Sequence, residues 1–338
     1  MKPEVIVAPD FRRVREIFDT ATLGRLDDLV DVVWGRDGPM PIDDFRSAAH
    51  RATAIIFGTW HYGRDALADA DPTLRHIFEV AGSFRHPDLD YQTCFERGIT
   101  VGSCAPAFGP VVAEMALALT LAAARLVTAG DSAFRSGEEQ WLHEGNARAT
   151  TLLGKTFGFV GAGGLSRHLQ ALLQPFNGRF LAYDPWLRPR DLHERSIEPV
   201  DLPTLFRRSD VVYVLAVPTP DNRHLVSRRL LELLAPPDIL VVISRAHLVD
   251  FDAVTQLVLD GRFRAAVDVF PQEPLASEHP IRTAGGAVLS AHRAGALPEA
   301  LLAIGRMVVA DLESLLAGVT PGRMQYATPD LISRLGVG

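Results

Sequence analysis

The sequence predicts an α/β protein made of two doubly wound parallel-sheet domains. Short apolar runs alternate with polar or amphipathic stretches of helical length over residues 1–104, and again from Thr156 onward. Many runs are apolar at every position, which is typical of strands covered by helices on both faces. With 338 residues, 47% of them hydrophobic, the chain is long enough to form a core in each domain.

The first series contains five strand candidates: VIVAP, LVDVVWG, TAIIFGT, HIFEVAG and ITVGS. After it, Pro110–Arg125 is Ala- and Leu-rich, begins with a proline suited to a first helical turn and predicts a long, buried helix. Residues 126–155 then interrupt the pattern with Gly, Ser and charge, and Trp141 is their apolar anchor. We expect this arm either to pack on a second subunit or to lie on the surface of its own chain.

The second series contains six strand candidates: FGFVG, RFLAYD, VVYVLAVP, ILVVIS, AAVDVF and AVLSA. The amphipathic stretch Leu297–Leu316 then predicts a closing helix. This second domain is expected to be the larger of the two.

Composition disfavours several classes of partner. The net charge of −7, without any basic block, argues against nucleic acid. The N-terminus lacks the apolar region of a secretory signal, and no apolar run approaches membrane-spanning length. Cys94 and Cys104 are too few for a disulfide framework or a metal cluster. We therefore expect a cytoplasmic protein with no nucleic-acid, membrane or metal partner.

A glycine-rich turn follows the strand candidate FGFVG and opens a helical stretch. In this turn, Gly161 permits a tight bend and Gly163 lets a pyrophosphate approach the backbone at a helix N-terminus. Asp184 ends the next strand, about twenty residues on, where an acid accepts hydrogen bonds from a ribose diol. The combination predicts a dinucleotide site; the alternative is that Asp184 is a simple turn residue before Pro185.

The expected dinucleotide is NAD rather than NADP. Asp184 would repel a 2′-phosphate, and the nearest cations, Arg188 and Arg190, lie further along the chain. Dinucleotide-binding turns follow the pattern G-x-G-x-x-G, and Ser166 stands at its third glycine. Because serine is small, we expect the helix to pack against the strand almost as closely as it would with glycine.

Three polar residues each follow a buried strand candidate in the last third of the chain: Arg245, Glu273 and His292. Because ligands bind at the carboxyl ends of open α/β sheets, we expect these side chains to converge on a small anionic substrate. Each also has a simpler interpretation: Arg245 as a helix cap or domain bridge, Glu273 as a turn residue before Pro274, and His292 as a core histidine.

These motifs, with AEMALALTLAAAR, LLGKTFGFVGAGG, AYDP, SRAHLVD, AAVDVFPQEPL and SAHRAG in order, resemble the D-isomer-specific 2-hydroxyacid dehydrogenases over almost the whole chain. The resemblance implies a flavodoxin-like substrate domain and a Rossmann NAD-binding domain with a cleft between them. We expect residues 1–104 plus 295–338 to form the first and 105–294 the second. It also implies a homodimer through the NAD domain, which suits the arm around Trp141.

By the same resemblance, Arg245 holds the substrate carboxylate and carbonyl oxygen, and His292 is the acid/base that protonates this oxygen. Glu273 pairs with His292, and Asp268 lies near the nicotinamide. Charge develops on the carbonyl oxygen during reduction, so a cation and a proton donor stabilise the transition state selectively. An arginine fork binds carboxylate at two points, and an imidazole beside a carboxylate titrates near working pH.

The predicted cofactor-binding residues are Gly161, Gly163, Gly164, Leu165, Asp184, Val217, Pro218, Ile243, Ser244, Arg245, Asp268, His292 and Gly295. The predicted substrate-binding residues are Ser83, Phe84, Arg85, Arg245 and His292.

Several positions depart from the family pattern. The loop after the fourth strand contains Ser83, Phe84 and Arg85 where small residues are usual. We expect Arg85 to contact a second acidic group of the substrate, or Phe84 to contact an apolar side chain of the substrate. The alternative is that both residues face solvent. Ala246 replaces a usual glycine and would be strained at positive φ. Arg293 adds positive potential beside His292.

The resulting prediction is an NAD-dependent oxidoreductase that transfers hydride between nicotinamide and C2 of a small 2-hydroxy or 2-keto acid. It is expected to be similar to glyoxylate/hydroxypyruvate reductase or to phosphoglycerate dehydrogenase. The alternatives are an NADH-sensing, corepressor-like scaffold without turnover and a phosphite-type dehydrogenase.

Overall fold

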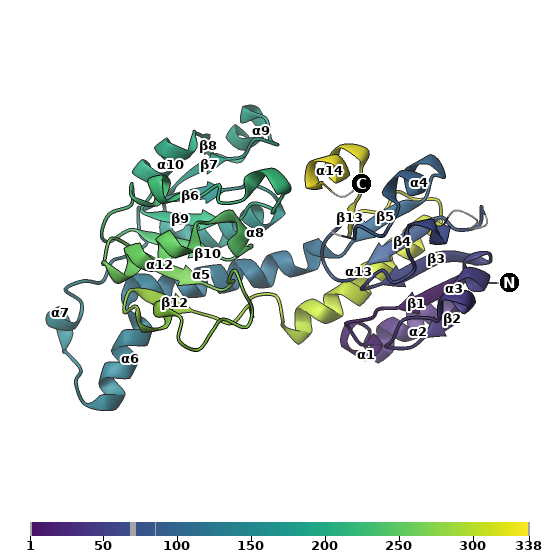
Figure 1. Cartoon of the computed structure of the whole chain (residues 1–338), viewed down its shortest axis with the longest axis horizontal. Helices are drawn as coiled ribbons and strands as arrows, with labels where there is room; N and C mark the ends of the chain where they lie inside the picture. The colour runs from purple at the N-terminus through teal and green to yellow at the C-terminus, as the bar shows by residue number, and fades with distance from the viewer. Residues whose placement is uncertain (1, 68–71, 85, 337–338) are drawn as a thin grey trace. The chain divides into compact units, whose positions relative to one another are not determined.

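The structure is a computed structural model that describes residues 2–67, 72–84 and 86–336. The chain forms two compact units, coloured in Figure 1 by position along the chain. Unit 1 comprises Met1–Phe108 and Ala296–Gly338, and unit 2 comprises Gly109–Gly295. These boundaries lie four residues and one residue beyond the predicted ones, which follow residues 104 and 294.

Unit 1 is built on a sheet with strand order β13-β5-β4-β3-β1-β2, in which only the β13–β5 pair is antiparallel. The order β2-β1-β3-β4-β5 is that of flavodoxin-like folds, as predicted. Its strands are β1 (Glu4–Ala8), β2 (Asp31–Gly35), β3 (Ala52–Phe57), β4 (His76–Glu79), β5 (Thr100–Ser103) and β13 (Gln325–Tyr326). Its helices are α1 (Val14–Ile17), α2 (Thr20–Leu29), α3 (Ile42–Ala49), α4 (Tyr91–Glu96), α13 (Pro298–Leu316) and α14 (Pro329–Leu335).

Both faces of this sheet are buried. Val5 and Val7 pack in one core with residues of α1, α2 and α13, whereas Ile6 and Ala8 pack in a second core with residues of α3, α4 and α14. Because successive side chains of a strand point to opposite faces, β1 must be apolar at nearly every position. This is why its sequence reads as an unbroken apolar run.

Unit 2 is built on an all-parallel sheet with strand order β12-β11-β10-β9-β6-β7-β8. This is the Rossmann order, and it reverses between β6 and β9. Its strands are β6 (Thr156–Val160), β7 (Arg179–Tyr183), β8 (Glu198–Pro199), β9 (Val211–Val214), β10 (Ile239–Val242), β11 (Arg264–Val267) and β12 (Ala287–Leu289). The predicted fold class is therefore confirmed for both units.

Helices cover both faces of this sheet as well. Residues of α10, α11 and α12 pack in one core, and residues of α5 and α8 pack in the other. The helices of unit 2 are α5 (Gly109–Arg125), α6 (Val127–Ser136), α7 (Leu142–Gly145), α8 (Gly164–Leu173), α9 (Pro189–His193), α10 (Leu202–Arg208), α11 (Arg228–Leu231) and α12 (Phe251–Leu259).

The long apolar helix predicted at Pro110 is α5. Ala105–Arg125, which contains it, is the one segment of the described residues that is long and apolar enough to cross a membrane by length and composition. Within unit 2, however, α5 contacts α8, β10 and β11 and buries a row of small side chains that includes Ala113 and Ala116. A helix buried in a protein core can be as long and as apolar as a membrane span, and α5 has the composition of such a core helix.

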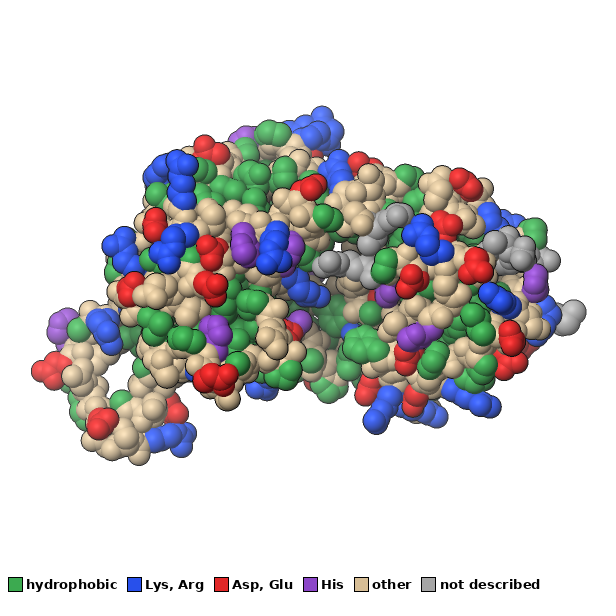
Figure 2. Space-filling view, in the orientation of Figure 1, with side chains coloured by type: hydrophobic (Ala, Val, Ile, Leu, Met, Phe, Trp, Pro, Cys, Tyr) green, Lys and Arg blue, Asp and Glu red, His purple; other side chains and the backbone are tan. Residues whose placement is uncertain are grey.

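The interrupting segment forms an arm, α6 and α7, that extends away from the sheet of unit 2 (Figure 1). Neither helix contains a buried residue. Phe134 and Trp141 are 62% and 66% exposed and meet edge to face. The space-filling view shows hydrophobic and charged side chains interspersed on this arm (Figure 2).

Candidate active site

The predicted cofactor residues lie at the carboxyl ends of six neighbouring strands of unit 2, with His292 and Gly295 after β12. Gly161 to Leu165 follow β6, Asp184 follows β7, and Val217 and Pro218 follow β9. Ile243 and Ser244 follow β10, and Asp268 follows β11. This edge includes the point where the strand order reverses, which is where open α/β sheets bind ligands.

The glycine turn has the geometry of a phosphate cradle. Gly161 has φ +93°, and a Cβ there would lie 2.5 Å from Ala216 Cα, so only glycine fits. A Cβ on Gly163 or Gly164 would meet nothing within 4 Å. The backbone at the start of α8 is thus open to the close approach of an anion.

Asp184 contacts this turn directly. Its Oδ2 accepts a hydrogen bond from the Ala162 N–H (2.7 Å), and its Oδ1 accepts from the N–H groups of Trp186 (2.8 Å) and Leu187 (3.2 Å). The turn role considered as the alternative is therefore present. Since each carboxylate oxygen accepts more than one hydrogen bond, that role does not exclude a ribose contact.

The other predicted cofactor residues differ in exposure. Val217 is half exposed, Leu165 and Gly295 are half-buried, and Pro218 and Ile243 are buried. Among the described residues, Ser244 Oγ and Ser290 Oγ are buried without a hydrogen-bond partner. A hydroxyl left without a partner at a strand end can pair with a polar ligand. Ser290, two residues before His292, is not among the predicted site residues.

Two of the three predicted catalytic side chains form a direct pair. His292 Nδ1 lies 2.6 Å from Glu273 Oε2, and both side chains are partly exposed. An ionised carboxylate can only accept, so Nδ1 carries the proton of this hydrogen bond. His292 Nε2 is therefore the ring nitrogen that can exchange a proton with a substrate.

Electrostatics keep Glu273 ionised. Burial opposes ionisation, but hydrogen bonds from His292 and from the Phe270 N–H (2.9 Å) outweigh it and, with the charges of His292 and Arg245, lower the pKa of Glu273. Arg245 is exposed, and its Nη1 donates to Ser244 O (2.7 Å). The three predicted catalytic groups thus occupy the carboxyl ends of β10, β11 and β12 and interact there.

The backbone of His292 is held in a left-handed conformation, with φ 50°. Asp268 maintains it: its backbone oxygen accepts from the His292 N–H (2.7 Å), and its carboxylate accepts from the N–H groups of Arg293 (3.0 Å) and Ala294 (3.2 Å). Asp268 is fully buried. Its carboxylate therefore positions the His292 loop, a role that the sequence did not reveal.

The expected strain at Ala246 is absent. Ala246 lies in a short 3₁₀ helix, Ala246–Leu248, and is not among the positive-φ residues of the described chain. The next residue, His247, places Nε2 2.9 Å from Thr219 O. This contact connects the segment after Arg245 to the loop after β9.

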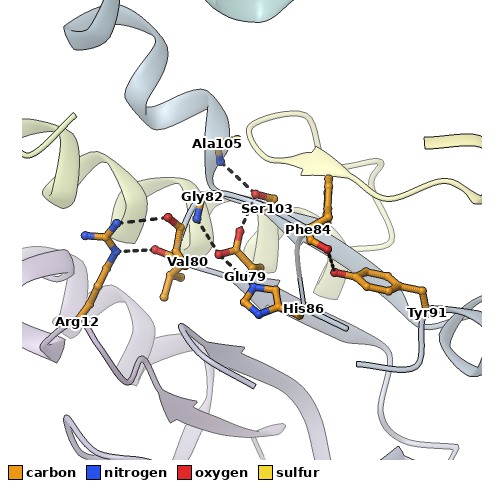
Figure 3. Close-up of polar contacts among 10 residues, drawn as sticks. Arg12, Glu79, Val80, Gly82, Phe84, His86, Tyr91, Ser103 and Ala105 are labelled. Atoms are coloured by element: carbon orange, nitrogen blue, oxygen red, sulfur yellow. Dashed lines mark hydrogen bonds and ion pairs between the residues drawn. The ribbon is translucent and has the colours of Figure 1, made fainter. Parts of the chain in front are cut away.

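In unit 1, the predicted substrate loop is fixed by a buried network at the carboxyl ends of β4 and β5 (Figure 3). The fully buried Glu79 accepts hydrogen bonds from the Gly82 N–H (2.7 Å) and from Ser103 Oγ (2.6 Å). His86 Nε2 lies 3.7 Å from Glu79 Oε1. The Arg12 Nε donates to Val80 O (2.7 Å).

Phe84 is 4% exposed and packs in the core of unit 1, where Tyr91 donates from its hydroxyl to Phe84 O (2.7 Å). The interpretation that Phe84 faces solvent is therefore wrong, since its ring anchors the loop. Ser83 is half-buried. Arg85 lies outside the described residues.

Comparison with known proteins decides the family. Residues 117–294 match the family model "D-isomer specific 2-hydroxyacid dehydrogenase, NAD binding domain". A glyoxylate reductase of Aeropyrum pernix is 31% identical over 328 residues, which cover 95% of this chain and 94% of the relative. The chain belongs to the D-isomer-specific 2-hydroxyacid dehydrogenases.

Two further relatives of this dehydrogenase are named as phosphoglycerate enzymes rather than as glyoxylate reductases. A D-3-phosphoglycerate dehydrogenase of Mycobacterium tuberculosis is 30% identical over 299 residues, 88% of this chain but only 55% of the relative. The crystal structure of a phosphoglycerate oxidoreductase from Rhizobium etli superposes with a TM-score of 0.87 at 34% identity and covers 97% of this chain and 99% of that one.

As a family member with a matching NAD-binding domain, the dehydrogenase uses NAD, and the predicted family, enzyme class and cofactor are confirmed. The residues at this edge of unit 2 fit NAD. The open backbone at Gly163 and Gly164 suits its pyrophosphate, and the orphaned Ser244 hydroxyl suits a polar contact.

Proposed function

We propose that this dehydrogenase reduces a small 2-keto acid at C2, with His292 as proton donor, Glu273 as its partner and Arg245 as the binder of the substrate carboxylate and carbonyl oxygen. The observation that supports this most strongly is the 2.6 Å contact between His292 Nδ1 and Glu273 Oε2 at a strand edge that Arg245 shares. When bound, NADH supplies the hydride.

The protein's own contribution follows from these contacts. Glu273 holds a proton of His292 on Nδ1 and so orients the ring, which leaves Nε2 to donate its proton to the carbonyl oxygen as negative charge develops there. The Arg245 guanidinium stabilises the same charge and binds the carboxylate as a fork. In the reverse direction, neutral His292 accepts the hydroxyl proton at Nε2.

Loop residues 81–84 of unit 1 are proposed to contribute to substrate binding through their backbone. Glu79, Arg12 and Tyr91 fix this loop, with the Gly82 N–H bound to Glu79, so its other N–H groups are set before a substrate arrives. We propose glyoxylate or hydroxypyruvate as substrates, with 3-phosphohydroxypyruvate as the alternative because some relatives are phosphoglycerate dehydrogenases.

A substrate panel tests this function. Glyoxylate, hydroxypyruvate, pyruvate, phenylpyruvate and 3-phosphohydroxypyruvate are supplied with NADH, and oxidation is followed by absorbance. At least one 2-keto acid is expected to turn over. Tight NADH binding without turnover of any of them would contradict the proposal and favour the scaffold.

The same panel run with NADPH tests cofactor preference. Asp184 stands at the end of β7 beside the glycine turn, where its negative charge opposes a 2′-phosphate. NADH is therefore expected to give the higher kcat/KM. A higher kcat/KM with NADPH would show that Asp184 does not discriminate against the 2′-phosphate. A cytoplasmic location, with access to a soluble NADH pool, remains part of the proposal.

We further propose a homodimer formed through the arm of unit 2. Val127, Phe134, Trp141 and Leu142 are 56% to 85% exposed on α6, on α7 and at the start of α7. An arm without buried residues gains little from folding on its own subunit, whereas a second copy would bury these side chains.

The double variant Phe134→Ser with Trp141→Ser is expected to convert the dimer to a monomer, measured by light scattering after gel filtration at micromolar concentration. Val319→Ser, an equally exposed apolar residue of unit 1, is the matched control and should leave the mass unchanged. A monomeric parent protein or a dimeric double variant would contradict the proposed interface.

A further inference from the structure

Arg195 lies outside every predicted site, yet its half-buried side chain reaches the glycine turn. It follows α9, and its Nη1 donates to Ala162 O (2.5 Å) while its Nη2 donates to Ser166 Oγ (2.9 Å). Gln170 of α8 contacts the same residue, with its Nε2 donating to Arg195 O (2.7 Å). These bonds join the turn and the first turns of α8 to a segment about thirty residues further along the chain.

The peptide units around Ala162 are held from two sides. The Ala162 N–H donates to Asp184 Oδ2, and the Ala162 carbonyl accepts from Arg195. In a planar trans peptide, the Gly163 N–H points opposite to the Ala162 carbonyl. Arg195 therefore fixes the direction of the Gly163 N–H, at the position where no side chain blocks the approach of an anion.

Ser166 makes this arrangement possible. It stands where the dinucleotide fingerprint has its third glycine, and it is fully buried. Its Oγ donates to Gly163 O (2.7 Å) and accepts from Arg195. Glycine at this position would remove both hydrogen bonds and leave a guanidinium proton without its acceptor.

The positive charge of Arg195 also favours an anion at the glycine turn. Burial lowers the pKa of Arg195, as does the neighbouring Arg167, while Asp184 raises it; a guanidinium nevertheless stays protonated. A fixed cation thus lies against the turn, where it adds to the positive end of α8 and partly offsets Asp184.

We propose that Arg195 and Ser166 form a latch that holds the glycine turn ready for the pyrophosphate of NAD. Both are positioning residues, because they act through the backbone of Ala162 and Gly163. The inference concerns unit 2 alone and rests on NAD binding, whichever 2-keto acid is reduced.

Direct binding of NADH, followed by fluorescence, tests the latch independently of turnover. Arg195→Met is expected to weaken NADH binding by about tenfold, and Ser166→Ala by about threefold, because one or two hydrogen bonds that preorganise the turn are lost. Arg190→Met, which removes an exposed arginine of α9, is the matched control and should bind as the parent does.

Ser166→Gly gives the sharpest result. If small size were all that this position requires, restoring glycine would leave NADH binding equal or improve it; the latch requires weaker binding. The double variant Arg195→Met with Ser166→Ala should lose less affinity than the two single losses combined, because both single variants remove the hydrogen bond between Arg195 and Ser166. Fully additive losses would overturn the inference.

Two ligands separate loop positioning from a general loss of structure. ADP-ribose contains the pyrophosphate and should lose the same factor as NADH in Arg195→Met, whereas AMP should lose less. Equal losses for AMP and ADP-ribose would overturn the latch. If Arg195→Met unfolds, Ser166→Ala carries the same comparison, since it removes only a hydroxyl.

Discussion

Replacement of His292 by alanine is expected to lower kcat for 2-keto acid reduction by about 10²- to 10⁴-fold, the usual contribution of a positioned acid/base. The imidazole is the group that Glu273 orients, through the 2.6 Å contact at Nδ1, and its Nε2 is the nitrogen proposed to protonate the substrate. Without it, the proton must come from water. Steady-state kinetics with a saturating 2-keto acid measure the loss.

NADH affinity provides the control for this variant. The turn proposed to bind the pyrophosphate, Gly161–Leu165, follows β6, whereas His292 follows β12 at the far edge of the sheet, so the Kd for NADH should change by less than about threefold, under 1 kcal/mol. Near-normal kcat in His292→Ala would remove the residue from the chemistry, whereas loss of NADH binding would indicate that the substitution disturbs the loop held by Asp268.

The companion variant Glu273→Gln tests the pair through pH. The pKa of Glu273 is lowered from its ordinary 4.5, so the carboxylate is present above that value and is lost only as pH falls through the lowered one. Across the neutral range Glu273 is therefore the ionised acceptor of the His292 Nδ1–H. With glutamine, reductase kcat/KM at neutral pH should fall below that of the parent, and the difference should shrink as pH falls through the lowered pKa of Glu273, where the parent loses its carboxylate too; equal kcat/KM at neutral pH would argue against the pairing role.

The second large effect is expected at Arg245. Arg245→Ala should lower kcat/KM for the 2-keto acid by about 10²- to 10³-fold, because it removes a cation that stabilises the developing oxyanion and binds the carboxylate. Both KM and kcat should worsen. Arg245→Lys should recover only part of the loss, because an ammonium retains the charge but not the fork.

Arg262→Ala, which removes an exposed arginine of the same unit, is the matched control and should leave both parameters unchanged. Binding of NADH should also persist in Arg245→Ala. An unaltered KM for every 2-keto acid in that variant would exclude Arg245 as the carboxylate binder.

The strands of both sheets were predicted from the sequence because a strand that is buried on both faces is apolar at nearly every position. The sequence could not reveal β8 and β13, since two-residue strands such as Glu198–Pro199 and Gln325–Tyr326 have no period. The arm helices were missed for a different reason. Val127–Ser136 has Val127 and Phe134 at helical spacing, but the Gly, Asp and Ser residues between them are those of a loop.

For the site, the pattern of strand ends predicted Arg245, Glu273 and His292, and the structure places them in the loops after β10, β11 and β12, with Glu273 and His292 in contact. Residues that act through the backbone were harder to predict. Nothing in the local sequence marks Arg195, whose partners lie about thirty residues away. A signal did exist for Glu79: a lone carboxylate in the run HIFEVAG must find buried partners, and it does so at Gly82 and Ser103.

The residues that hold the His292 loop and the glycine turn all belong to unit 2, and those that hold the loop at Ala81–Phe84 all belong to unit 1. Each loop is thus supported by the sheet that it follows. A substitution at Glu79 or Arg12 should therefore rearrange the unit 1 loop and leave the hydrogen bonds that support the two loops of unit 2 in place.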